Sequence, residues 1–199
     1  MTPNQINNQT YKSFSEADFS NFYNTVSFYM FKRYGIRLEE AVLEEPKTGE
    51  FDGIHIFISD NLHFEDKLFL LLHLFGHTVQ WQTSERSRNL GLLQPELIEF
   101  NEYRMSLLPK LDMIFEYEKE ACQYGLRLLE ESNIVDLTQW LSDWFNADWK
   151  FLKRIYTLGY REEFRINFKS QYFFYNTTLL KSKQIPRFNL KNWAKKFAF

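Results

Sequence analysis

Residues 67–81 read Lys-Leu-Phe-Leu-Leu-Leu-His-Leu-Phe-Gly-His-Thr-Val-Gln-Trp, and this stretch decides the fold. Apolar side chains cover nearly the whole circumference of the helix expected from about Phe64 to Gln82, which predicts a central, buried helix. Two histidines, His73 and His77, interrupt this apolar surface. Because they lie four residues apart, both imidazoles project from one face, close enough to share a metal ion.

The histidine pair alone leaves two interpretations open. An imidazole in an apolar interior needs a hydrogen-bond partner or a metal ion, because an unpaired buried polar group costs a few kcal/mol. The pair is therefore either a metal site or two core histidines that bond to backbone or carboxylate groups. A third ligand from another segment would distinguish the two interpretations.

A second helical stretch, over residues 111–131, supplies the candidate third ligand. One face of this helix carries a carboxylate followed by small residues, in the order Glu118, Ala121, Cys122, Gly125 and Leu129. Small residues let a neighbouring backbone approach closely, and Gly76 lies between the two histidines of the other helix. We therefore expect Glu118 to reach a metal ion held by both imidazoles.

Three other side chains on this helix receive different interpretations. Cys122 lies on the same face and is predicted to be a small packing residue rather than a soft extra ligand. Glu116 and Glu120 fall on other faces and are expected to point into solvent.

The remaining patterns predict a mostly helical α+β protein. With only 7 Gly and 5 Pro in 199 residues, a turn-rich β-sandwich is disfavoured. Apolar residues alternate over 54–58, which predicts a strand, and residues 46–53 are typical of a turn. Further helices are expected over residues 15–34, about 95–107 and 137–156.

Charge divides the chain into two parts. Residues 164–199 hold eight Lys or Arg residues and no Asp or Glu, so residues 1–163 are acidic. We expect 1–163 to form the metal-binding domain and 164–199 to be a basic, aromatic segment packed on the same domain. Cations among aromatic rings also bind nucleic acid, and the candidates for such contacts are Lys191, Lys195 and Lys196.

Composition also bears on location. A single cysteine cannot form an internal disulfide, which favours a reducing compartment. The N-terminal residues lack a secretory pattern, and the longest apolar run is too short to span a bilayer. The expected location is cytoplasmic, without membrane contact, and nothing in the sequence indicates the oligomeric state.

The order of these motifs resembles the ImmA/IrrE-type zinc metallopeptidases of the zincin group, over residues 15–131. The similar features are a strand, then His-x-x-x-His on a helix, then Glu-x-Glu-Ala-x-x-Tyr-Gly-x-x-Leu-Leu on a later helix, over 118–129. The resemblance implies one zinc ion held by His73, His77 and Glu118. It also implies a zincin-like fold, in which a small sheet packs on the central metal-binding helix and the strand over 54–58 is the edge strand that aligns a substrate. His55 and Phe57 on this strand are candidate substrate- or partner-binding residues. His55 lies on the face opposite the isoleucines and is expected to face either the metal cleft or solvent.

One position departs from the family pattern. The family has a glutamate directly after the first histidine, and this chain has Leu74 there. That glutamate is the general base of the family's reaction, a role that leucine cannot perform. Such assistance is typically worth about 10²–10⁴-fold in rate, so the departure implies a poor peptidase.

Several functions are consistent with this sequence. The first is a zinc-binding, metallopeptidase-like protein that is catalytically impaired and acts as a regulatory or binding pseudoenzyme on a protein or peptide partner. The second is an active metallopeptidase with a relocated general base. The same ligands would also suit an iron-type triad, although such triads usually occur on β-barrels. The last is a metal-free module that binds nucleic acid or protein.

Overall fold

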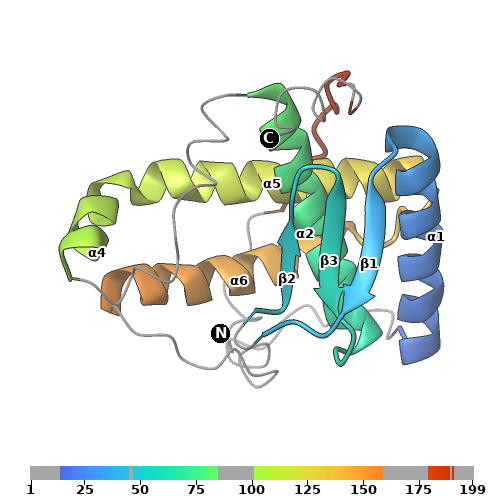
Figure 1. Cartoon of the computed structure of the whole chain (residues 1–199), viewed down its shortest axis with the longest axis horizontal. Helices are drawn as coiled ribbons and strands as arrows, with labels where there is room; N and C mark the ends of the chain where they lie inside the picture. Colours follow the sequence, from blue (N-terminus) through green and yellow to red (C-terminus); the bar gives the residue numbers. More distant parts are fainter. Residues whose placement is uncertain (1–13, 45–46, 85–100, 159–178, 189, 191–199) are drawn as a thin grey trace, which may run out of the picture.

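The computed structural model describes residues 14–44, 47–84, 101–158, 179–188 and 190 (Figure 1). The fold is mostly helical α+β with a small sheet, as predicted, and the described sheet has three strands in mixed orientation. The elements run in the order α1 (Glu16–Tyr34), β1 (Arg37–Ala41), β2 (Gly49–Phe51), β3 (His55–Ser59), α2 (Phe64–Thr83), α4 (Asn101–Leu107), η2 (Leu108–Lys110), α5 (Leu111–Glu131) and α6 (Thr138–Leu158).

Helix α1 begins and ends where local chemistry predicts. The Ser15 hydroxyl accepts a hydrogen bond from the Asp18 backbone N–H at 3.2 Å, and the Asp18 carboxylate accepts from the Ser15 backbone N–H at 2.8 Å. This reciprocal pair is a capping box, which satisfies two donors that the first turn leaves open. Gly35 ends the helix in the left-handed region, at φ 74°, where a side chain would be strained.

The sheet corrects two predictions. Its strand order is β1-β3-β2, so β3, which was expected at the edge, lies in the centre. β1 pairs with β3 in parallel and β2 pairs with it in antiparallel fashion. The stretch 46–53, predicted as a turn, contains the edge strand β2. Three residues are too few to show an alternating pattern, and pairing with β3 stabilises a strand that local propensity does not specify.

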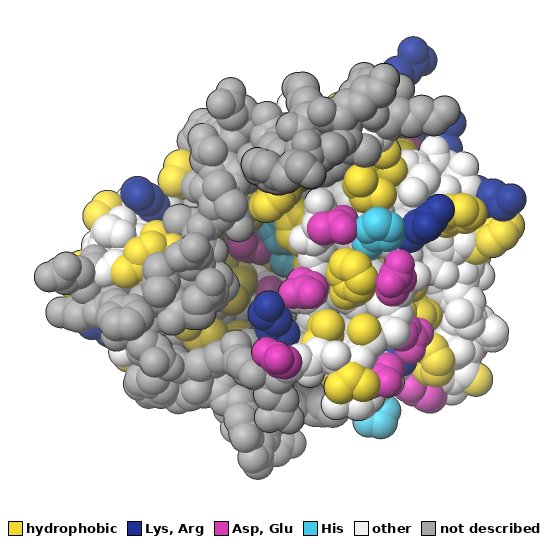
Figure 2. All heavy atoms as spheres, in the orientation of Figure 1, with side chains coloured by type: hydrophobic (Ala, Val, Ile, Leu, Met, Phe, Trp, Pro, Cys, Tyr) yellow, Lys and Arg dark blue, Asp and Glu magenta, His cyan; other side chains and the backbone are white. Residues whose placement is uncertain are grey.

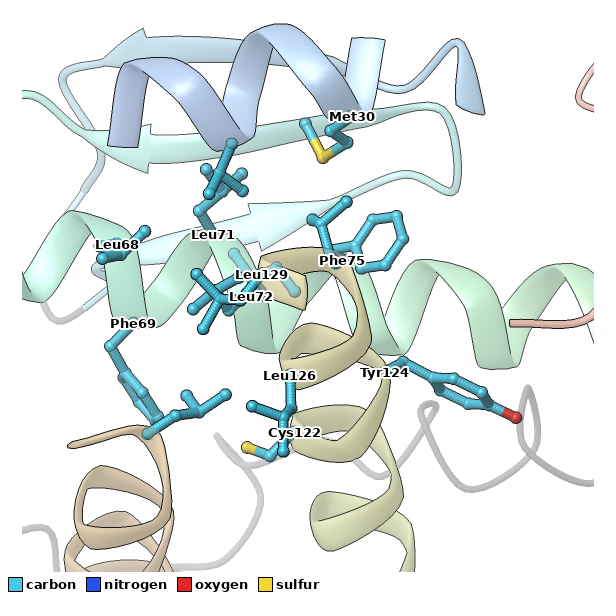
Figure 3. Close-up of a cluster of buried hydrophobic side chains, with 14 of the residues drawn as sticks. Met30, Leu68, Phe69, Leu71, Leu72, Phe75, Cys122, Tyr124, Leu126 and Leu129 are labelled. Atoms are coloured by element: carbon cyan, nitrogen blue, oxygen red, sulfur yellow. The ribbon is translucent and has the colours of Figure 1, made fainter. Parts of the chain in front are cut away.

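Helix α2 is the centre of the molecule, as its sequence predicts. It packs against the sheet, α1 and α5, and Figure 3 shows its apolar side chains meeting Met30 of α1 and Leu126 and Leu129 of α5. Even Lys67 is buried, and its ammonium group pairs with Glu40 of β1 at 2.5 Å. No helix in the described part of the chain is both long and apolar enough to cross a membrane.

Small residues bring α2 and α5 together, as predicted. A Cβ built at Gly76 would overlap the backbone of Ala121 on α5. A Cβ at Gly125 would lie 2.7 Å from the carbonyl oxygen of Leu72. The two helices therefore touch through their backbones, and this contact fixes the height at which side chains of α5 meet those of α2.

The described part of the basic C-terminal segment packs on the same core. Leu180 and Ile185 are buried, and the backbone N–H of Leu180 donates to the Ser142 hydroxyl of α6 at 2.9 Å. The boundary predicted at 163/164 lies outside the described residues, as do Lys191, Lys195 and Lys196. The domain division and the nucleic-acid contacts stay predictions.

The contact between α2 and α5 predicts that replacing Gly76 by alanine lowers the stability of the protein. In an ordinary helix interior, replacing glycine by alanine stabilises by about 0.8–1 kcal/mol. We expect Gly76→Ala to destabilise by about 1–3 kcal/mol instead, because the new methyl group overlaps the backbone of α5. Urea unfolding measures the change, with Asn24→Ala on the exposed surface of α1 as control. An unchanged or raised stability for Gly76→Ala would contradict the close approach.

Candidate metal centre

Three side chains from two helices converge on one point. His73 and His77 project from α2, and Glu118 projects from α5 across the glycine contact. The Nε2 atoms of the two histidines are 2.9 Å apart, and Oε2 of Glu118 lies 3.1 Å from His73 Nε2 and 3.2 Å from His77 Nε2. Among the residues that the structure describes, these three side chains form a group that could hold a metal ion.

The triangle of atoms has the size that a small divalent cation requires. Ligand atoms about 2.0–2.2 Å from a tetrahedral zinc ion lie about 3.3–3.5 Å apart. The observed separations of 2.9, 3.1 and 3.2 Å are slightly shorter. Two ring nitrogens and a carboxylate oxygen lie close enough together to bind one ion. The residues therefore fit a metal ion.

Electrostatics at the site show what a cation would replace. Burial alone would lower the pKa of His73, but Cys122 and the Glu118 carboxylate outweigh it and raise this pKa well above its ordinary value. Burial would raise the pKa of Glu118, but the neighbouring histidines hold it well below its usual range. Glu118 is thus an anion at neutral pH beside a protonated His73, and a metal ion would replace this positive charge.

Gln80 fixes the chemical state of His77. The Gln80 side-chain amide donates to the carbonyl oxygen of Tyr117 at 2.9 Å and to Oε2 of Glu120 at 2.8 Å. Both of its donors are therefore used, and its Oε1 atom, 2.9 Å from His77 Nδ1, must accept a hydrogen bond. The proton of neutral His77 then lies on Nδ1, which leaves the lone pair of Nε2 free for a metal ion.

Cys122 is the polar neighbour of the outer nitrogen of His73. Its buried sulfur lies 3.2 Å from His73 Nδ1, on the outer side of the ring. The sulfur does not belong to the group of ligand atoms that could share a metal ion. Cys122 thus supports a histidine as well as filling space, a role that the sequence prediction of simple packing missed.

Aromatic rings hold both imidazoles in place. The ring of His77 lies between Phe51 of β2, at a centroid distance of 6.0 Å, and Tyr117 of α5, at 4.7 Å. The ring of His73 stacks on Phe69 at 5.6 Å, and Phe69 stacks on Trp144 of α6 at 4.8 Å. The site is therefore walled by β2, α5 and α6, which limits the rotamers that either histidine can adopt.

Position 74, directly after the first histidine, is apolar and packed. Leu74 is 8% exposed, and its Cδ1 would lie 2.9 Å from a Cβ built at Gly49 of β2. Glu65, an acid earlier on α2, accepts hydrogen bonds from the indole N–H groups of Trp140 and Trp144 at 3.0 and 3.1 Å. Glu65 therefore serves the contact between α2 and α6 rather than the metal centre.

Glu120 is not a free surface acid, contrary to the sequence prediction. Its side chain is 27% exposed, and its two oxygens accept hydrogen bonds from Gln80 and from Lys183. Glu116 is exposed, as expected, and pairs with Lys119 at 3.1 Å. Helix periodicity placed Glu120 on another face than Glu118, but it could not show that α2 and the C-terminal segment both meet that face.

Asp148 of α6 is an acid near the site that the sequence did not single out. It lies one helical turn after Trp144, on the side of α6 that reaches Phe69 and His73. Among the described residues its carboxylate has no hydrogen-bond partner. Burial raises the pKa of Asp148 to about 6. The positive charge of His73 acts in the opposite direction, and the negative charge of Glu118 raises the pKa further. The sequence signal for Asp148 was only its spacing of four residues from Trp144 on the same helix.

His55 and Phe57 lie apart from the metal centre. They alternate on β3 with Ile56 and Ile58, which are fully buried against α2, so they face the other side of the sheet. His55 Nδ1 lies 2.9 Å from Asp52 Oδ2, and the ring centroids of His55 and Phe57 are 6.0 Å apart. The outer surface over the strands carries histidine, acidic and hydrophobic side chains (Figure 2). Their predicted part in binding a partner stays a prediction.

Comparison of the chain with models of protein families, with curated proteins and with solved structures found no match. The geometry of the site therefore carries the functional argument by itself.

The environment of Asp148 predicts a pH-dependent gain in stability on substitution. Burial raises its pKa from an ordinary value of 3.8 to about 6 in the folded protein, so ionisation destabilises the folded state increasingly from about pH 4 to pH 6. We expect Asp148→Asn to stabilise the metal-free protein by about 2–3 kcal/mol above pH 6. The gain should nearly vanish at pH 4.

Urea unfolding in the presence of a chelator, at pH 4 and pH 7.5, measures this difference. Asp112→Asn is the control, because Asp112 is an exposed aspartate on α5 and its substitution buries no new group. A loss of stability at pH 7.5 for Asp148→Asn would show that the folded protein favours the ionised carboxylate.

Proposed function

We propose that the chain binds one zinc ion through His73, His77 and Glu118. The observation that supports this proposal is the convergence of three ligand atoms within 2.9–3.2 Å of one another, with the outer nitrogens of both imidazoles engaged by Gln80 and Cys122. Two imidazoles and one carboxylate form a ligand set that zinc takes in hydrolytic sites, where a fourth position stays open.

We further propose that the protein is metallopeptidase-like but catalytically impaired, and that it acts on a peptide or protein partner by binding. Zinc in such a site supplies Lewis-acid activation of water and of a carbonyl group. Position 74 holds a leucine, which cannot take the proton from a zinc-bound water. What supports a peptide partner is β2, an edge strand whose Phe51 stacks on His77, because an edge strand can pair with an extended peptide.

Metal analysis tests the first part of this proposal. We expect one zinc ion per chain, and we expect His73→Ala, His77→Ala and Glu118→Ala each to weaken zinc binding by at least about 100-fold. Competition with a chromogenic chelator measures the affinity. His63→Ala is the matched control, because the His63 side chain is 72% exposed and lies outside the site. Absence of zinc binding by the unsubstituted protein would end the proposal.

Asp148 favours a second candidate function, an active metallopeptidase with a relocated general base. Its carboxylate lies close enough for the charges of His73 and Glu118 to affect its pKa, which burial raises to about 6. An acid that titrates near neutral pH can take up and release a proton under working conditions. In this alternative Asp148 performs the role that the glutamate at position 74 has in the related family.

Hydrolysis of unstructured peptides distinguishes the two candidates. If the site is impaired, the zinc-loaded protein should show no chelator-sensitive cleavage, and Leu74→Glu should introduce it. If Asp148 has replaced the base, the unsubstituted protein should cleave, and Asp148→Asn should slow cleavage by about 10²–10⁴-fold. Mass spectrometry of a peptide mixture, with and without chelator, measures both. Equal cleavage by the unsubstituted protein and Asp148→Asn would remove the second candidate.

A further inference from the structure

The C-terminal segment 179–188 reaches the outer side of the metal centre. Its backbone is anchored at two points, because the N–H of Leu180 donates to the Ser142 hydroxyl at 2.9 Å and that of Lys183 donates to the Gln123 carbonyl at 3.2 Å. The first contact is on α6 and the second on α5. Lys183 is thereby held beside the α5 turn that follows Glu118.

The side chain of Lys183 begins a continuous series of polar contacts that ends at a metal ligand. Its ammonium group donates to Oε1 of Glu120 and lies over the ring of Tyr124, 5.5 Å from the centroid. The other oxygen of Glu120 accepts from Gln80 at 2.8 Å. Gln80, only 1% exposed, in turn accepts from Nδ1 of His77 at 2.9 Å.

Each contact in the series restricts the next one. Glu120 can accept from Gln80 only while its carboxylate stays turned inward, and the Lys183 ammonium holds the opposite oxygen. Gln80 presents its carbonyl to His77 only because both of its N–H donors are occupied, by Glu120 and by the Tyr117 backbone. His77 offers Nε2 to a metal ion only in the tautomer that this carbonyl selects.

We propose that segment 179–188 is part of the outer shell of the metal centre, and that zinc binding and docking of this segment stabilise each other. Lys183, Glu120 and Gln80 are positioning residues, since they act on the ion through His77. The inference rests on the proposed zinc site. It follows from linkage, because a docked segment that improves the site must itself be stabilised when the site is filled.

The size of the expected effect decreases along the series. Gln80 touches a ligand directly, and loss of such a partner typically weakens metal binding by about 10–100-fold. Lys183 is 46% exposed and acts through two intervening side chains, so we expect about two- to fivefold for Lys183→Met. Glu120→Gln keeps an acceptor for Gln80 but loses the charge that attracts Lys183, so it should resemble Lys183→Met.

Zinc affinity by chelator competition is the first test. Gln80→Leu should weaken binding most and Lys183→Met less, while Lys181→Met, an equal loss of charge from the same segment, should leave the affinity unchanged. In the double variant Gln80→Leu/Lys183→Met, the second substitution should add nothing, because the series is already interrupted. Equal affinities for Lys183→Met and Lys181→Met would overturn the inference.

Hydrogen exchange of the segment is the second test, and it does not depend on the affinity of any variant. Saturating zinc should slow exchange of the Leu180 and Lys183 amides in the unsubstituted chain. It should slow them much less in Gln80→Leu, whose folding is checked by the exchange of α1. If the unsubstituted chain binds zinc but exchange in 179–188 does not change, this inference fails and the zinc site stands. If the chain binds no zinc, the proposed function fails first.

Discussion

The structure depends on the backbone contact between α2 and α5. At Gly76 and Ala121 the two helices lie so close that no side chain fits between them, and the same is true one turn away at Gly125 and Leu72. This spacing brings the carboxylate of Glu118 to within 3.1 and 3.2 Å of two imidazoles on the other helix. A larger residue at the contact would move α5 outward and open the triangle of ligand atoms.

The fold could be predicted where one segment carries its own signal. The apolar circumference of α2, the Ser15–Asp18 capping box of α1 and the small-residue face of α5 are properties of single helices. The edge strand β2 could not be predicted, because Gly49–Phe51 is a strand only through its pairing with β3. β3 was expected at the edge because of the family resemblance, and its central place is set by pairing with both β1 and β2, which no single segment of sequence shows.

In the candidate site, too, some residues could be predicted from one segment and others only from contacts between segments. His73 and His77 are related by helix periodicity, and Glu118 by a face of small residues, so local pattern was sufficient to bring them together. Gln80, Glu120 and Lys183 act through contacts between α2, α5 and a segment about 60 residues further along the chain. Asp148 meets the site because Trp144 packs on Phe69. These partners depend on the tertiary arrangement of helices, which the sequence pattern does not encode residue by residue.

Leu74 shows that the residue directly after His73 contributes to packing without disturbing the candidate ligands. A leucine at this position packs beneath Gly49 and joins α2 to the edge strand, whose Phe51 in turn covers His77. A glutamate there would place a charge in the contact between the helix and β2, at a desolvation cost unless it served the metal site. The ligands themselves do not depend on that acid, because Gln80 fixes the tautomer of His77, and Cys122 and the surrounding rings limit the rotamers of the imidazoles. A site of this kind can therefore keep its capacity to hold a cation while the residue at position 74 contributes to packing instead of proton transfer.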